Sequence, residues 1–321
     1  MSKSFGPMST ADEVLEGIDL SGRRILVTGA SAGLGVETAR ALVARGAEVV
    51  GAVRDQDKAR RATEHVRATA TRGGSLTLKK LDLASLASVR ACSNQLLAAG
   101  KSFDVVIANA GVMACPQSKT SDGFETHFGT NHLGHFVLVN RIISLFKSGS
   151  RLIILSSGGH RFSDVDLADP NFEHTPYAPF VAYGRSKTAN ILFAVEFDRL
   201  YKSQSIRAAA VHPGSIETQL GRHLTQEAKQ AAMKEVEAAR STSTQAFTWK
   251  SIQQGAATSV WAACVATAEE IGGRYCEDCS VAEIVSGVGT TPKGVRPYAV
   301  DLERAKALWA KSVEMVSERF S

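Results

Sequence analysis

A tyrosine and a lysine stand four positions apart in FVAYGRSKTANILF (180–193), a stretch with the composition of a helix. On a helix, side chains at i and i+4 lie one turn apart on the same face, so Tyr183 and Lys187 would be neighbours. A nearby ammonium favours the phenolate and lowers the pKa of a tyrosine, which is ordinarily about 10. Such a shift suits general acid/base catalysis. By itself the pair fits packing better than chemistry, so the rest of the chain must supply a substrate and a cofactor.

Short β-branched runs alternate with helical stretches along the chain, a pattern typical of βαβ units and a parallel sheet. The predicted strands are 23–28, 47–53, 76–83, 103–110, 151–157, 206–213 and a weaker run at 273–281. The predicted helices are 34–45, 56–71, 85–99, 122–146, 180–202 and 251–267. We therefore expect an α/β fold: a single Rossmann-type domain, doubly wound, with a mostly parallel seven-stranded sheet and helices on both faces.

Two segments lie outside this alternation. Thr10-x-x-Glu13 is a capping-box signature, which predicts a short helix in an N-terminal extension over 1–20, ahead of a domain at 21–321. Residues 219–250 form an Ala-rich helical segment between Ser/Thr-rich joints, and we expect them to act as a lid over the substrate.

Six predicted strands end in a polar or glycine-rich segment: TGASAGLG, VRD, LDLAS, NAGV, SSGGH and HPGSIET. Ligands of open parallel sheets bind beyond these carboxyl ends. In the first segment, Gly29, Gly33 and Gly35 let the backbone approach a pyrophosphate, and the following helix offers it N-terminal N–H groups. The spacing is G-x-x-x-G-x-G rather than G-x-G-x-x-G, but the strand–turn–helix context indicates a dinucleotide site.

The end of the second strand indicates which nicotinamide dinucleotide binds. An acid there can bond the ribose 2′-hydroxyl, whereas an arginine can accept a 2′-phosphate. Val53 takes the usual place of the acid and Arg54 follows it. We therefore expect NADP(H), with NAD(H) as the alternative if a shift of one residue puts Asp55 in that place.

The order and spacing of these motifs resemble the short-chain dehydrogenases/reductases over about residues 20 to 290. The matching set is TGASAGLG, Asp82-Leu83, Asn109-Ala110-Gly111, Asn131, the serines at 156–157, Tyr183-x-x-x-Lys187 and Pro213-Gly214-x-Ile216-x-Thr218. Within that family, GFETHFGTNHLGHF (123–136) and AYGRSKTANILF are similar to the retinol-dehydrogenase and WW-domain oxidoreductase branch. Light-dependent protochlorophyllide reductases share a similar TNHLGHF stretch.

The resemblance implies four catalytic residues. Tyr183 would be the general acid/base and Lys187 its activator. Ser157 would hold the substrate oxygen, with its hydroxyl aimed at the developing alkoxide, and Asn131 would end a water-linked proton path. The hydride chemistry would belong to the cofactor.

The resemblance also implies a set of residues that contact the dinucleotide. These are Gly29, Ser31, Gly33, Leu34, Gly35, Arg54, Asp82, Leu83, Asn109, Ala110, Gly111, Tyr183, Lys187, Pro213, Gly214, Ile216 and Thr218. Asp82 and Leu83 would flank the adenine, and Ile216 and Thr218 would meet the nicotinamide carboxamide.

Two features depart from the common family pattern. The usual Asn-Asn-Ala-Gly begins with Ala108 here. Ser157 precedes Tyr183 by 26 positions (183 − 157), a longer separation than most members have. Alternation along the strand leaves both Ser156 and Ser157 as candidates for the catalytic serine, and the family alignment favours Ser157.

Composition excludes several other classes. The net charge of +5 comes with scattered basic residues, so we expect no nucleic-acid partner. No run reaches the roughly 18 apolar residues of a membrane span, and MSKSFGPMST has no apolar signal region. With five cysteines in no framework spacing, we expect a cytoplasmic protein. Neither Cys276-x-x-Cys279 nor His127, His132 and His135 has the partners of a metal site, so we expect none.

The expected function is an NADP(H)-dependent oxidoreductase that interconverts a primary or secondary alcohol and an aldehyde or ketone. Aromatic residues in the long loop 158–182 indicate a bulky, apolar substrate, and the expected partner is a small hydrophobic alcohol or carbonyl compound. The alternatives are a protochlorophyllide-reductase-like C=C reductase and a dinucleotide-binding regulator without turnover. The resemblance further implies a homodimer or homotetramer, built through the helices that hold Asn131 and Tyr183.

Overall fold

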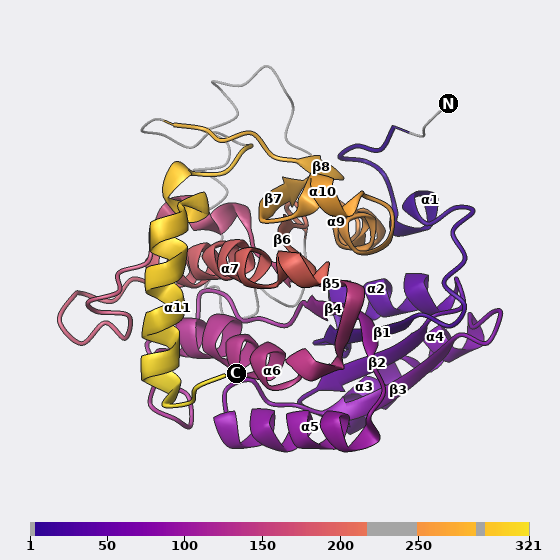
Figure 1. Cartoon of the computed structure of the whole chain (residues 1–321), viewed down its shortest axis with the longest axis horizontal. Coiled ribbons are helices and arrows are strands. Elements are labelled where there is room, and N and C mark those ends of the chain that lie inside the picture. Colours follow the sequence, from indigo (N-terminus) through magenta and orange to yellow (C-terminus); the bar gives the residue numbers. More distant parts are fainter. Residues whose placement is uncertain (1–3, 217–248, 287–292, 321) are drawn as a thin grey trace.

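The β-branched runs form one eight-stranded sheet in the order β3-β2-β1-β4-β5-β6-β7-β8 (Figure 1). The computed structural model describes residues 4–216, 249–286 and 293–320. Its strands are β1 (Arg24–Thr28), β2 (Glu48–Val53), β3 (Ser75–Lys80), β4 (Phe103–Ala108), β5 (Phe146–Leu155), β6 (Arg207–His212), β7 (Arg274–Glu277) and β8 (Ser280–Val281). The predicted α/β class and mostly parallel sheet are confirmed.

The strand order reverses next to β1. β1 pairs with β2 on one side and with β4 on the other, and every neighbouring pair from β3 to β7 is parallel. The chain therefore builds outward to β3 and then returns past β1 to continue with β4. In open α/β sheets, such a reversal opens a crevice for ligands beyond the carboxyl ends of the strands.

The sheet has eight described strands rather than the seven predicted. The run 273–281 folds back on itself, so that β7 pairs antiparallel with β8 and Glu277 lies opposite Ser280. Asp278 and Cys279 form the turn with φ angles of 52° and 56°. A two-residue hairpin of this kind needs positive φ at both central positions, and the Asp-Cys pair lacks the glycine that usually announces it.

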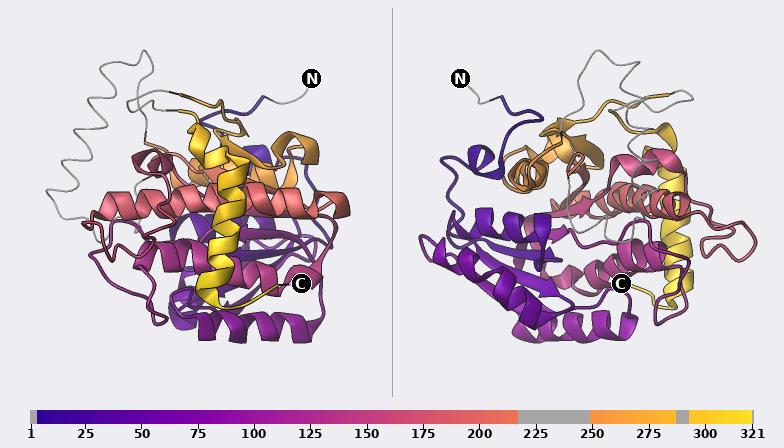
Figure 2. Two further views of the ribbon diagram at one scale, coloured as in Figure 1. Left: turned by 60° about the vertical axis from the view of Figure 1, so that its left-hand side comes forward. Right: turned by 180° about the vertical axis from the view of Figure 1, so that it is seen from behind.

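Helices cover both faces of the sheet (Figure 2). One face carries α5 (Leu86–Ala99), the π-helix η1 (Phe128–Leu133), α6 (Gly134–Arg141), α7 (Pro179–Tyr201) and α11 (Leu302–Val316). The other face carries α1 (Ala11–Val14), α2 (Gly33–Val43), α3 (Gln56–Ala62), α4 (Glu64–Ala68), α9 (Ile252–Cys264) and α10 (Ala268–Ile271). The 3₁₀ turns are η2 (Ile143–Leu145), η3 (Gly158–Phe162), η4 (Lys202–Gln204) and η6 (Pro297–Val300).

The central strand β1 contributes to two hydrophobic cores. Leu26 belongs to the core under α5, α6 and α7, whereas Ile25 and Val27 belong to the core under α2 and α9. All three side chains are completely buried. Successive side chains of a strand point to opposite faces, so a strand covered by helices on both sides is apolar throughout.

Two helix predictions were wrong in extent, and one long helix was missed. The stretch 56–71 divides into α3 and α4 at Thr63, whose hydroxyl donates to the Ala59 carbonyl at 2.7 Å. The stretch 122–146 becomes helical only at Thr126, and its last residue, Phe146, already begins β5. The C-terminal helix α11 was not predicted.

The N-terminal capping box is confirmed. The Thr10 hydroxyl accepts from Glu13 N at 3.3 Å, and the Glu13 carboxylate accepts from Thr10 N at 2.7 Å. α1 lies against α9 with Ala11 and Val14 buried, while the domain boundary at residue 20 stays a prediction. In the ranges that the structure describes, no helix has both the length and the apolar character needed to cross a bilayer.

A buried hydrogen bond joins α11 to the π-helix. α11 lies across α7 (Figure 1), with Trp309 packed edge-on against Phe136 at 5.0 Å between ring centroids. Ser312 Oγ donates to the Leu308 carbonyl at 2.8 Å, so it accepts from His132 Nε2, 2.7 Å away. Burial lowers the pKa of His132 to about 3, which keeps the ring neutral.

We predict that Ser312→Ala lowers the free energy of unfolding by about 1–3 kcal/mol, because it leaves the His132 N–H buried without an acceptor. Chemical denaturation of both proteins measures the difference. Ser148→Ala, at an exposed position of β5, is the control and should be neutral. Equal stability of the Ser312 variant and the wild type would contradict the assignment.

Candidate active site

The turn after β1 has the shape of a phosphate-binding loop. Gly29 and Gly33 have φ angles of 77° and 52°. A Cβ on Gly35 would stand 2.4 Å from the Gly29 carbonyl oxygen, so only glycine permits this approach. No side chain caps α2 at Ala32, which leaves the N–H groups of its first turn suited to an anion. The turn, with half-buried Ser31 and Leu34, therefore fits a dinucleotide pyrophosphate.

The loop after β4 is held against this turn by Thr28. The Thr28 hydroxyl accepts from Asn109 N at 2.9 Å and from Ala110 N at 3.0 Å, and Asn109 Nδ2 donates to the Thr28 carbonyl at 2.7 Å. A Cβ on Gly111 would lie 3.1 Å from Asn131 Oδ1 and 3.5 Å from Lys187 Nζ. The predicted Asn-Ala-Gly segment thus lies between the glycine turn and the predicted catalytic residues.

Arg54 and Asp55 follow β2 at the edge of a shallow hollow. The hollow has a volume of about 390 Å³ and is lined by Arg54, Asp55, Gln56, Asp57, Arg60 and Lys80. Asp55 caps α3, since its carboxylate accepts from Lys58 N at 2.9 Å. That bond lowers the pKa of Asp55 and uses its carboxylate locally, whereas three basic side chains face the hollow.

The loop after β3 packs closely on α6. Asp82 N donates to Ser88 Oγ at 2.9 Å, and the Asp82 carboxylate accepts from Ala84 N at 3.0 Å. Leu83 is buried, and a Cβ on Gly134 would stand 2.5 Å from its carbonyl oxygen. Asp82 and Leu83 are therefore fixed at the carboxyl end of β3, in the row of loops that also contains the glycine turn.

Tyr183 and Lys187 share one face of α7, as predicted from their spacing. Their exposed fractions are only 3% and 4%. Lys187 Nζ donates to the Leu155 carbonyl at 3.0 Å and lies 5.7 Å from the centroid of the Tyr183 ring. The pair therefore stands at the carboxyl end of β5, next to Gly111.

Burial acts on the two pKa values in opposite directions. It raises the pKa of Tyr183 to about 12, against an opposing hydrogen bond with the Ser157 side chain. It lowers the pKa of Lys187 to about 8. For the chain by itself, burial outweighs the hydrogen bond with Ser157, so the pKa of Tyr183 lies above its ordinary value. The expectation that Lys187 lowers this pKa stays a prediction.

The two serines at the end of β5 have different surroundings. Ser156 is buried and donates to the Lys187 carbonyl at 2.8 Å, which fastens β5 to α7. Ser157 is half-buried, and its hydroxyl accepts from Gly159 N at 3.0 Å and interacts with Tyr183. A Cβ on Gly159 would approach the Tyr183 ring to 2.6 Å. Ser157 is therefore the serine beside Tyr183.

Asn131 lies within the π-helix η1 and is completely buried. Its side chain accepts from Val112 N at 2.8 Å, and donates to the Val112 carbonyl at 3.0 Å and to Ser186 Oγ at 2.9 Å. π-helical turns occur often at functional sites. Asn131 thus joins the loop after β4 to α7, one turn from Tyr183.

The loop after β6 is the last of the loops at the carboxyl ends of the parallel strands that the sequence analysis assigned to the cofactor. Pro213, Gly214 and Ile216 are half-buried, and Ile216 forms an isolated bridge with Lys250. Gly214 has a φ of 92°, and a Cβ there would stand 2.6 Å from Lys250 Cδ. Thr218 and the predicted lid 219–250, apart from its last two residues, lie outside the described residues.

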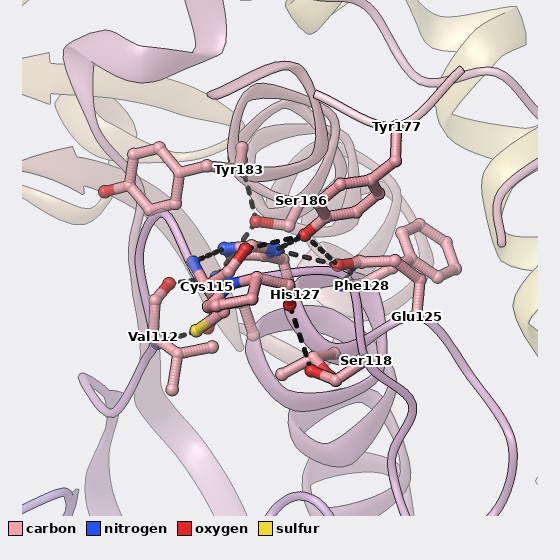
Figure 3. Close-up of polar contacts among 12 residues, drawn as sticks. Val112, Cys115, Ser118, Glu125, His127, Phe128, Tyr177, Tyr183 and Ser186 are labelled. Atoms are coloured by element: carbon pink, nitrogen blue, oxygen red, sulfur yellow. Dashed lines mark hydrogen bonds and ion pairs between the residues drawn. The ribbon is translucent and has the colours of Figure 1, made fainter. Parts of the chain in front are cut away.

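The bonding partners of several polar residues near the site were not recognised from the sequence. Figure 3 shows Glu125, His127 and Tyr177 gathered with Cys115 behind Tyr183. His127 Nδ1 lies 2.7 Å from Glu125 Oε1. His135, 107 positions from Thr28, lies 2.9 Å from its hydroxyl. No local pattern reveals the bond between Thr28 and His135, because the two residues come from distant segments.

The cysteines and histidines that the structure describes do not form a metal-binding group. Among residues 4–216, 249–286 and 293–320, no three or more His, Cys, Asp or Glu side chains lie where they could hold a metal ion. Cys276 and Cys279 are buried free thiols of the β7–β8 hairpin. Burial raises their pKa values to about 12 and about 11, which disfavours thiolate chemistry.

Comparisons with known proteins agree with this geometry. The profile of the family described as short chain dehydrogenase matches residues 23–229. Retinol dehydrogenase 14 of Mus musculus is 36% identical over 311 residues, which cover 92% of this chain and 86% of that protein. The crystal structure of an uncharacterized protein from Mycobacterium Paratuberculosis is 32% identical, with a TM-score of 0.72 over 98% of this chain and 99% of that one. The angucycline C-6 ketoreductase LanV, solved with bound NADP, is 25% identical, with a TM-score of 0.63 over 82% and 95%.

We predict that Lys187→Met raises the free energy of unfolding at pH 7 by about 1–3 kcal/mol, because it removes a buried charge. The folded pKa of about 8 lies below the ordinary 10.5, so the destabilisation is complete below pH 8 and disappears as the pH rises to 10.5. Denaturation of both proteins between pH 7 and 10.5 measures this convergence. A difference that does not change with pH would contradict it.

Proposed function

The chain belongs to the short-chain dehydrogenase/reductase family and is an NAD(P)-dependent oxidoreductase, and we propose that it interconverts an alcohol and a ketone or aldehyde on a hydrophobic substrate with NADP(H). The observation that carries this proposal is the meeting of Tyr183, Lys187 and Ser157 beside the loop that contacts the glycine turn. A regulator that only bound a dinucleotide would need neither the serine nor a lysine buried at this energetic cost.

The proposed chemistry divides between the cofactor and the chain. When bound, the dinucleotide supplies or accepts the hydride. Tyr183, whose pKa burial raises to about 12, keeps its proton at neutral pH and can donate it to a carbonyl oxygen. Ser157 bonds the same oxygen as its charge develops. Asn131 supports the proton path by fixing Val112 and, through Ser186, the turn of α7 that holds Tyr183.

The basic hollow after β2 supports NADP(H) over NAD(H). Arg54 comes first after the strand, and Arg60 and Lys80 line the same hollow. A guanidinium can bind a 2′-phosphate through paired hydrogen bonds. Asp55, the acid that would favour NAD(H), is engaged in capping α3.

A hydrophobic carbonyl substrate is supported by the relatives and by part of the long loop. One relative is named a retinol dehydrogenase and another a ketoreductase. In the loop that precedes α7, Phe162 is 45% exposed, and its ring centroid lies 5.8 Å from that of Phe180 in the first turn of α7. Phe172 is buried under Arg185, whose guanidinium lies 4.0 Å from the ring centroid. This phenylalanine therefore stabilises the loop rather than lining a substrate cavity.

A cytoplasmic location and a homo-oligomer stay predictions. The subunit contact implied by the resemblance uses the helices that hold Asn131 and Tyr183. In this chain α11 packs on α7, with Trp309 against Phe193 at 5.8 Å between ring centroids. A homodimer or homotetramer would therefore need surfaces that α11 leaves open.

We predict that Tyr183→Phe lowers kcat for ketone reduction by about 10²–10⁴-fold, because the proton donor is lost. NADPH oxidation with a panel of hydrophobic cyclic ketones, aldehydes and enones measures this, and product analysis distinguishes C=O from C=C reduction. NADPH binding should change little. Tyr201→Phe, at the far end of α7, is the matched control, and equal turnover by both variants would refute the assignment.

We predict that Arg54→Ala weakens NADPH binding by about 10–100-fold and leaves NADH binding nearly unchanged, because only NADPH carries the 2′-phosphate. Fluorescence titration with each dinucleotide measures the two affinities. Arg67→Ala, on the exposed side of α4, controls for the loss of one positive charge. A parallel loss for both dinucleotides would argue against phosphate recognition by Arg54.

A further inference from the structure

Side chains from other segments hold the loop after β4 at both ends. Asn131 accepts from Val112 N and donates to the Val112 carbonyl, as described above. Cys115 N donates to His127 Nε2 at 3.1 Å, and the Tyr177 hydroxyl donates to the Cys115 carbonyl at 2.9 Å. All four backbone polar groups of Val112 and Cys115 are therefore bonded by side chains from other segments.

The loop between these two ends has an unfavourable backbone conformation. Ala114 has a φ of 49°, in the left-handed region that residues with a Cβ rarely occupy. Such a conformation persists only where the surrounding structure imposes it. The bonds to Val112 and Cys115 are the described interactions that can impose it.

Glu125 holds His127, the side chain that bonds Cys115 N at the second end of the loop. Its carboxylate is only 2% exposed and accepts from Phe128 N and from His127 Nδ1, each at 2.7 Å. Because Cys115 N donates to His127 Nε2, that nitrogen must carry a lone pair, and the ring proton belongs on Nδ1. Burial lowers the pKa of His127, but its bonds to the Cys115 and Glu125 side chains outweigh burial and raise the pKa to about 9. In the bonding shown, Nε2 carries no proton, since a proton there would face the Cys115 N–H.

The attached loop lies behind the Tyr183 ring. The His127 ring meets the Tyr183 ring edge-on, with 6.2 Å between centroids and 69° between planes. Figure 3 shows the Tyr183 hydroxyl pointing away from Glu125 and His127. Since both nitrogens of His127 are engaged with Glu125 and Cys115, His127 supports the tyrosine and does not exchange protons with the substrate.

Tyr177 connects this arrangement to the long loop that precedes α7. It stands two residues before Pro179, the first residue of α7, and its hydroxyl points into the cluster (Figure 3). The Tyr177 ring packs against Phe172, with 5.2 Å between ring centroids. Tyr177 therefore contacts the loop through its ring and the cluster through its hydroxyl. One hydroxyl thereby links the loop 158–178 to the backbone beside Tyr183.

We propose that Glu125, His127 and Tyr177 are positioning residues that fix the loop 112–115 rigidly behind Tyr183. Tyr177 also fastens the segment 158–178, here named the substrate loop, to the loop 112–115. This inference rests on the proposed carbonyl reduction and adds to it a specificity element outside the Asn-Ser-Tyr-Lys set. Glu125 and His127 act on the orientation of Tyr183, and Tyr177 acts on the position of the substrate loop.

Two conservative variants test the proposal. Glu125→Gln keeps the shape but turns one acceptor into a donor, and we expect kcat for the best ketone to fall about tenfold. Tyr177→Phe keeps the ring but releases the Cys115 carbonyl, and we expect KM for the ketone to rise about tenfold with kcat nearly unchanged. The Kd for NADPH should stay within about twofold in both, since neither residue lies near the glycine turn.

Glu303→Gln and Tyr201→Phe are the matched controls, one on the exposed side of α11 and one at the end of α7. Both should keep wild-type kcat and KM. Hydrogen exchange without substrate gives a readout independent of turnover: the amides of residues 112–118 should exchange at least about tenfold faster in Glu125→Gln and Tyr177→Phe. Those of α9 should not change, which shows that the variants are folded.

Unchanged exchange at 112–118 together with wild-type kcat and KM in both variants would overturn the proposal. Faster exchange without any change in kcat or KM would also overturn it, because the loop would then be held without positioning the reaction. If the wild type turned over no carbonyl, the proposed function would fail, and the exchange data would still decide whether Glu125 and Tyr177 hold the loop.

Discussion

The hydroxyl of Thr28 at the end of β1 joins the three segments on which the site depends. It accepts from the two N–H groups of Asn109 and Ala110, so its own proton goes to His135 Nε2 at 2.9 Å. His135 Nδ1 then donates to the Asn131 carbonyl at 2.9 Å. The glycine turn, the loop after β4 and the π-helix are thus held in one geometry by a buried chain of bonds, at the point where the strand order reverses.

Burial has opposite consequences for function and stability at this site. It keeps Tyr183 protonated at neutral pH and lowers the pKa of Lys187. The same burial makes the charged form of Lys187 destabilising for the folded state. Side chains with strongly shifted pKa values cluster at functional sites because the chemistry needs those values. The chain tolerates that cost because the two hydrophobic cores on either side of the sheet surround the site with apolar packing.

Features that depend on local sequence could be predicted. Alternating strands and helices, the glycine turn, the Thr10–Glu13 capping box and the i,i+4 spacing of Tyr183 and Lys187 each rest on residues close in the chain. The errors arose where longer-range contacts decided the outcome. The hairpin of β7 and β8 depends on left-handed backbone at Asp278 and Cys279, and α11 is stabilised by packing on distant aromatic side chains.

The sequence by itself determined the family, the parallel sheet and the glycine turn after β1, because spacing and glycine placement follow from backbone geometry. Only the tertiary structure decided which serine lies beside Tyr183: Ser156 bonds the backbone of α7, while Ser157 interacts with the tyrosine. It also decided the partners of His127, His132 and His135 and the direction of the Tyr183 pKa shift. These properties depend on burial and on contacts between residues up to 180 positions apart, as in His132 and Ser312, which no local pattern records.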